Sequence, residues 1–170
     1  MALSKIDAAN FLTGTIPQSN VANASLGAVT ALPAAITTGK IVQAAYAVST
    51  SEVTTSSGAV ITSLSFTPTS SSNKVILFGN VSQIRKADAG TSSAAGIDIR
   101  VGSTQTNARG MNEGYPQNES DIRGNITCIG YHDCWSGSET VALKSSGFGS
   151  NISYNYQSAP GTLVVLEVEV

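Results

Sequence analysis

Apolar and polar side chains alternate with a two-residue period along most of the chain after Lys40. This period places successive side chains on opposite faces of a β-strand, whereas an amphipathic helix needs a period near 3.6 residues. Segment 162–170 is the clearest case, because its even-numbered positions from 164 onwards are all Val or Leu, whereas Glu167 and Glu169 occupy odd positions. We expect the even-numbered side chains to face the core and the two glutamates to face solvent.

Other segments with strand character are separated by turn sequences rich in Gly, Ser and Pro, such as Thr67–Asn73. The apolar run Val75–Phe78 occupies both faces of its strand, which is typical of a strand in the middle of a sandwich. Residues 103–123 show no clear period and are expected to form a long loop. The other expected strands are 41–48, 53–66 (one bent strand or two), 74–85, 96–102, 126–134, 140–145 and 151–157. This pattern predicts an all-β head domain over residues 40–170, an antiparallel β-sandwich of jelly-roll type.

Residues 1–39 follow a different rule. Their larger apolar side chains recur first at a step of five, which fits neither a strand nor a helix, and Pro17 and Pro33 interrupt the segment. Such a segment buries too little apolar surface to offset the entropy of ordering its backbone. We therefore expect an extended N-terminal arm that is ordered by copies of itself or by a larger assembly; the alternative is a short helix from Asn20 to Ala31. The side chains expected to make the apolar contacts of this arm are Phe11, Leu12, Ile16, Val21, Leu26 and Leu32.

Composition restricts the class of partner. Only 12% of the residues are charged, against about 25% in an average soluble protein, and the net charge is −2. A chain with so few cations has no basic stripe to neutralise phosphates, so we expect no nucleic-acid partner. No apolar run approaches the roughly 18 residues that span a bilayer, and the first residues lack the apolar core of a signal peptide. We expect neither membrane insertion nor export by the general secretory route.

Cys128 and Cys134 are the only cysteines. If they lie on one extended strand, their Cα atoms are about 20 Å apart, far beyond the limit of about 7 Å for a disulfide. We therefore expect free thiols. His132 is the only histidine, so the cysteines and this histidine supply three ligands and leave a structural zinc site incomplete. We expect no metal and no cofactor.

The pattern of reactive residues does not favour an enzyme. A Ser-His-Asp site would have to use His132, whose neighbour Asp133 points to the opposite face of the same strand. The chain has no GxSxG turn and no phosphate-binding loop. Glu113, Glu119 and Asp121 share one loop and leave glycosidic hydrolysis open, although a solvated acidic loop explains them equally simply.

Several segments resemble the short fibre and appendage proteins of tailed bacteriophages, especially marine and cyanobacterial phages. The arm, LTGTIPQSNVANASLGAVTALP followed by ITTGKIVQ, is similar to the junction between stalk and head in those proteins. SLSFTPTSSSNKVILFGNVS, GIDIRVGSTQ, ETVALKSSG and the closing TLVVLEVEV are similar to strands and turns of their heads. The resemblance implies a virion protein assembled in the host cytoplasm, a homotrimer whose arm contacts capsid, neck or tail proteins.

Two non-enzymatic functions remain open within that resemblance. One is a structural fibre or capsid-decoration protein; the other is a receptor-binding tip that recognises a host surface glycan. Sugars bind to aromatic platforms, and the aromatic residues near candidate loops are Tyr115, Trp135, Tyr154 and Tyr156. Because aromatic residues make up only 6% of the chain, the structural function is the stronger expectation.

Overall fold

The computed structural model describes residues 40–54, 57–87, 93–115, 121–147 and 152–170, with the side chains of 93 and 112–115 excepted. The predicted arm, residues 1–39, lies outside the described residues. The elements are strands β1 (Ile41–Ser49), β2 (Val53–Thr54), β3 (Ser57–Phe66), β4 (Lys74–Lys86), β5 (Ser93–Val101), β6 (Thr104–Tyr115), β7 (Ile122–Asp133), β8 (Glu139–Ser146), β9 (Ile152–Tyr154) and β10 (Gly161–Val168), with a short 3₁₀ turn at Tyr156–Ser158.

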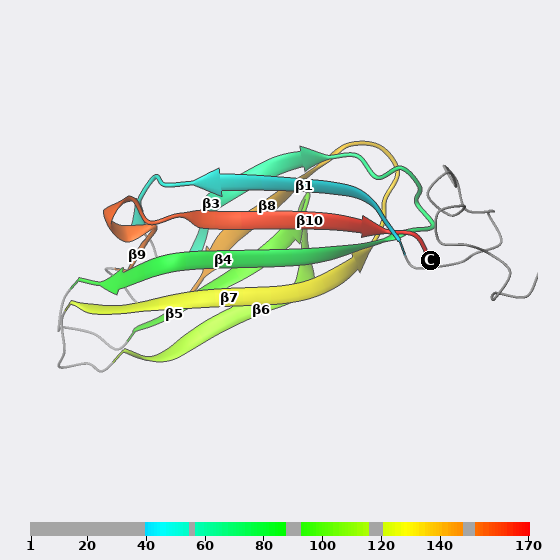
Figure 1. The fold of residues 1–170 in the computed structure, drawn as a ribbon. Coiled ribbons are helices and arrows are strands. Elements are labelled where there is room, and N and C mark those ends of the chain that lie inside the picture. Colours follow the sequence, from blue (N-terminus) through cyan, green and yellow to red (C-terminus); the bar gives the residue numbers. More distant parts are fainter. Residues whose placement is uncertain (1–39, 55–56, 88–92, 116–120, 148–151) are drawn as a thin grey trace, which may run out of the picture. The chain divides into compact units, whose positions relative to one another are not determined.

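The strands form two antiparallel sheets. The first has the order β1-β10-β4-β7. Past the end of β10, the short strand β9 pairs with the last residues of β4, and β2 pairs with β9. The second has the order β3-β8-β5-β6. Figure 1 shows β1, β10, β4 and β7 side by side in front of the other sheet. The expected all-β class with antiparallel sheets is confirmed, and its two layers are consistent with a sandwich.

β4 is central in the first sheet, as the run Val75–Phe78 predicts, because it pairs with β10 along one edge and with β7 along the other. Val75 and Leu77 are completely buried between the sheets. Ile76 and Phe78 are only half-buried on the outer face, so this strand is not covered on both sides by the described residues. A glycine at position 79 lets the sheets approach closely, since a Cβ there would lie 2.6 Å from Leu143 Cδ1.

The expectation of a long loop over 103–123 is wrong for most of its length. Residues Thr104–Tyr115 form β6, and β7 begins at Ile122 rather than at 126. The reason is that β6 is polar: it pairs with β5 only, and among its described side chains only Ala108 and Thr106 are buried. A strand with so few apolar positions has no hydrophobic period to detect.

The expected strand at 151–157 is also shorter than predicted. It ends after Tyr154, where Asn155 takes a left-handed conformation with φ of 54°. The 53–66 segment, which the sequence leaves as one strand or two, contains the two strands β2 and β3.

The alternation in β10 is correct, but its two faces are reversed. Leu163, Val165 and Glu167 are completely buried, while the even-numbered positions from 164 to 168 lie half-buried on the outer face. The assignment of Glu167 to a solvent face is therefore wrong. Both parities of this strand carry apolar side chains, so the pattern alone does not decide which one faces the core.

The buried Glu167 carboxylate is fully engaged by the loop between β3 and β4. It accepts hydrogen bonds from the Thr69 backbone N–H at 2.9 and 3.0 Å and from the Thr69 hydroxyl at 2.7 Å. The Asn73 side-chain amide donates at 2.7 Å and the Ser70 N–H at 3.2 Å. Burial raises the pKa of Glu167, but these donors outweigh burial and hold the pKa below its ordinary value. This carboxylate fixes the loop to the end of the sandwich.

Candidate functional site

Tyr156 lies in a cluster of charged side chains at one end of the described strands. The guanidinium carbons of Arg85 and Arg123 lie 4.8 and 5.2 Å from the centre of its ring. Asp121 accepts from Arg85 Nε at 2.6 Å and from Arg123 Nη2 at 3.3 Å. Hydrogen bonds from Arg85, and then from Arg123, lower the pKa of Asp121. Both arginines therefore lie against the ring and share the Asp121 carboxylate, which balances one of their two positive charges.

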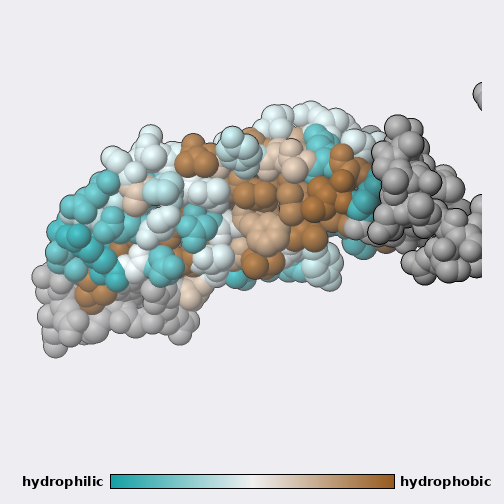
Figure 2. Space-filling view, in the orientation of Figure 1, coloured by the Kyte–Doolittle hydropathy of each residue, from teal (hydrophilic) through white to brown (hydrophobic). Residues whose placement is uncertain are grey.

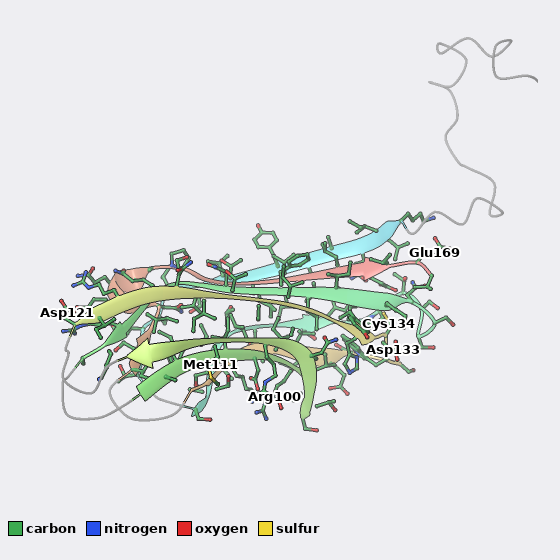
Figure 3. All side chains as sticks on the ribbon, turned by 90° about the horizontal axis from the view of Figure 1, so that it is seen from below. Arg100, Met111, Asp121, Asp133, Cys134 and Glu169 are labelled. Atoms are coloured by element: carbon green, nitrogen blue, oxygen red, sulfur yellow. The ribbon has the colours of Figure 1, made fainter. Side chains whose placement is uncertain are left out.

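Trp135 lies beyond the end of β7 and packs edge-on against Phe66, with ring centres 5.9 Å apart, and against His132 at 6.0 Å. It is half-buried against the core. Figure 3 shows Asp133 and Cys134, its neighbours in the chain, at the opposite end of the strands from Asp121. Trp135 therefore belongs to a different region from the Tyr156 cluster.

Of the remaining aromatic candidates, Tyr154 adds no surface to either region. Tyr154 has no exposed surface, and its hydroxyl lies 3.4 Å from the Gly96 N–H inside the molecule. The side chain of Tyr115 lies outside the described part. Of the four predicted sugar-contacting aromatics, the three with described side chains, Trp135, Tyr154 and Tyr156, do not form one exposed cluster.

Candidate acid–base groups are likewise separated in the described residues. Asp133 pairs with Lys74 Nζ at 2.5 Å, and hydrogen bonding to Lys74 lowers its pKa. Asp121 is held by two arginines, and Glu119 and the Glu113 side chain lie outside the described part. The described residues contain no group of three or more His, Cys, Asp or Glu side chains placed to hold a metal ion.

Both cysteines are free and buried. Burial raises the pKa of Cys128 to about 11, and burial also raises that of Cys134 to about 11. Thiols with such pKa values are almost entirely protonated at neutral pH and react slowly.

An open hollow of about 270 Å³ lies on the second sheet, lined by Arg109 and Met111 of β6 and Ser146 of β8 among the described side chains. Asp98 of β5 is the cross-strand partner of Arg109. Asp98 has no exposed surface, and Arg100 Nη2 lies 3.3 Å from its carboxylate. Figure 3 places Arg100 and Met111 on the same layer.

An apolar patch lies on the outer side of the first sheet. Cross-strand register aligns two transverse rows, each with one residue from β1, β10, β4 and β7. We call these eight residues the apolar face; its aliphatic side chains belong to the wide brown area over those strands in Figure 2. The rows are Tyr46, Val164, Phe78 and Ile129, and next to them Ala44, Leu166, Ile76 and Tyr131.

The sequence interpretation missed this surface. A signal was present in the sequence, because β4 and β10 carry large aliphatic or aromatic residues at consecutive positions. A strand with only one face in the core needs such residues at every second position. The sequence interpretation assigned the even-numbered residues of β10 to the core and the odd-numbered residues to the solvent-facing side.

Comparison with known proteins adds no relative: no family model matches the chain, and no curated protein is significantly similar to it. None of the helices in the described part is long and apolar enough to cross a membrane.

Proposed function

We propose that the protein is a non-enzymatic structural protein of a tailed-phage virion, a homotrimeric fibre or decoration appendage that docks to the particle through residues 1–39. The observation that carries the proposal is the strand order. Each of the pairs β1/β10, β3/β8, β4/β7 and β5/β6 is antiparallel, which is the pairing of one long hairpin rolled into two layers.

That pairing supports a jelly roll, an architecture found in viral capsid and lectin domains. The support is an analogy at the level of the fold, and one fold hosts many functions. The segments that resemble phage appendages, and the separation of reactive groups among the described residues, favour the structural function over an enzyme.

Docking is assigned to the arm because its scattered apolar side chains need a surface to cover them. Each large apolar side chain contributes about 1.5–3 kcal/mol when fully buried. Replacing Phe11 and Ile16 together by Asp places two charges against the proposed apolar contact, where burying an unpaired charge is unfavourable. The double variant should be lost from purified particles while its head stays folded.

A matched control adds the same two charges at polar positions, with Thr13 and Ser19 replaced by Asp. This variant should remain on particles. If the Phe11 and Ile16 double variant co-purifies with particles at full occupancy, the arm is not the anchor.

A second candidate function is glycan recognition by a fibre tip, favoured by the hollow lined by Arg109, Met111 and Ser146. A guanidinium and a hydroxyl beside an apolar side chain are groups that bind sugars. A glycan array probed with the full chain tests this function. Binding that Arg109→Ala abolishes, and that Lys40→Ala leaves unchanged, would support the tip; absence of binding would leave the structural function.

A further inference from the structure

The apolar face lies at the upper end of what a monomer normally exposes. Tyr46 is 76% exposed, Ile129 61% and Tyr131 60%. Counting each aromatic side chain as about 200 Å², the eight residues expose on the order of 600 Å² of apolar surface. The largest patch on a typical monomer is about 300–600 Å² and is often functional. With Ile41 and Val48 at its ends, the face approaches the roughly 800 Å² that each partner buries in a stable interface.

The rim of this face is polar, and its charges are already neutralised. Beyond one row, Lys74 and Asp133 form an ion pair with each other. Beyond the other row, Asn80 Nδ2 donates to Thr127 Oγ1 at 2.8 Å. The eight residues themselves carry no charge. An apolar centre with a polar rim is typical of a protein interface. A partner surface that is also apolar and uncharged matches this face.

We infer that copies of this chain associate through the apolar face, so that the β1-β10-β4-β7 sheet of one copy lies against the same sheets of the neighbouring copies around the symmetry axis. A second copy supplies a surface of the same chemistry and width. Sheets pack face to face at about 10 Å, and four strands span roughly 15–20 Å. A single extended pass of the arm is one strand wide and leaves most of the face uncovered.

This inference rests on the proposed function, which includes a homotrimer, and it identifies the apolar face as the surface through which the copies associate. In a trimer, the three apolar faces turn towards the common axis.

The test compares two variants on the face, Tyr46→Asp and Ile129→Asp, with a control on the other sheet, Val60→Asp. Val60 is 48% exposed, so the control adds the same charge at an exposed apolar side chain. Light scattering and sedimentation velocity of the full chain at micromolar concentration give the mass. We expect an oligomer for wild type and control, and a dissociation constant raised about tenfold or more for each face variant.

Oligomeric face variants with unchanged dissociation constants would overturn the inference and leave the proposed trimer standing. A monomeric wild-type chain would overturn both. An oligomer that depends on the face but is absent from particles would support the inference and refute the proposed function.

Cysteine protection provides a second measurement that does not depend on variant stability. The native thiols are buried, so Tyr46→Cys introduces the accessible thiol. Its alkylation should be slow in concentrated protein and should accelerate on dilution, whereas Val60→Cys should react rapidly at every concentration. Protection of Tyr46→Cys that is independent of concentration, in a monomer, would mean that the arm covers the face and would overturn the inference.

Discussion

Replacing Glu167 by Gln should destabilise the sandwich strongly, although the two side chains have nearly the same shape. The carboxylate is completely buried and accepts hydrogen bonds from Thr69, Ser70 and Asn73. Gln removes the charge and turns one acceptor oxygen into an NH₂ group that faces other donors.

The magnitude follows from those contacts. A hydrogen bond to a charged group contributes about 1.5–3 kcal/mol, but the contributions are not additive. Thr69 and Ser70 are exposed residues, so water replaces part of what they lose. We expect the free energy of unfolding to fall by about 2–4 kcal/mol at pH 7. Glu169→Gln is the matched control: Glu169 is half-exposed and pairs with Lys40 at 3.2 Å, and such surface pairs contribute about 0–1 kcal/mol.

The same carboxylate predicts a pH dependence. The pKa of Glu167 in the folded protein lies below its ordinary value of 4.5. The contribution of Glu167 to the free energy of unfolding is therefore complete above pH 4.5 and is lost as the pH falls through the folded pKa. The difference in stability between wild type and Glu167→Gln should therefore shrink in acid. Urea unfolding followed by circular dichroism at pH 7 and at acidic pH measures both effects. A loss for Glu167→Gln no greater than for Glu169→Gln would refute this reasoning.

Two further predictions concern packing and the thiols. Gly130→Ala should cost about 1–3 kcal/mol of stability in urea unfolding, because its Cβ would lie 2.5 Å from Ala108 N of β6 in the second sheet. Asn125→Ala, at an exposed position on β7, should change stability little, and equal stabilities of the two variants would contradict the packing. Cys128 and Cys134 should alkylate at least tenfold more slowly in the native protein than in urea, since burial raises each pKa to about 11; rapid native labelling of Cys128 would show that the sheets open readily.

The all-β class could be predicted from the sequence because short strand-like segments recur between turns rich in Gly, Ser and Pro, and no helical period competes with them. The face of β10 could not be predicted in the same way. Leu163 and Val165 fill the core as well as Val164 and Leu166 would, and in the structure Glu167 is buried on the same side as Leu163 and Val165, where it binds Thr69. That contact joins residues almost a hundred positions apart, and local pattern does not contain it.

The surface groups were predicted less well for a related reason. Tyr156 has a polar neighbourhood in sequence, yet the arginines that stack on it come from β4 and β7. Tyr154 was expected near a loop at the surface, but it pairs with Ile84 of β4 and its side chain is buried in the core. Which aromatic side chains remain exposed depends on how the strands are paired, and pairing is a long-range property.

Averaged cryo-electron images of purified phage particles test the proposed function most directly. We expect a three-fold appendage in which each copy contributes one sandwich, with the β1-β10-β4-β7 sheets turned towards the axis and the connection to the particle made on the side of residues 1–39. Particles that lack the chain altogether, or that carry it as single copies attached through the sandwich, would contradict the proposal.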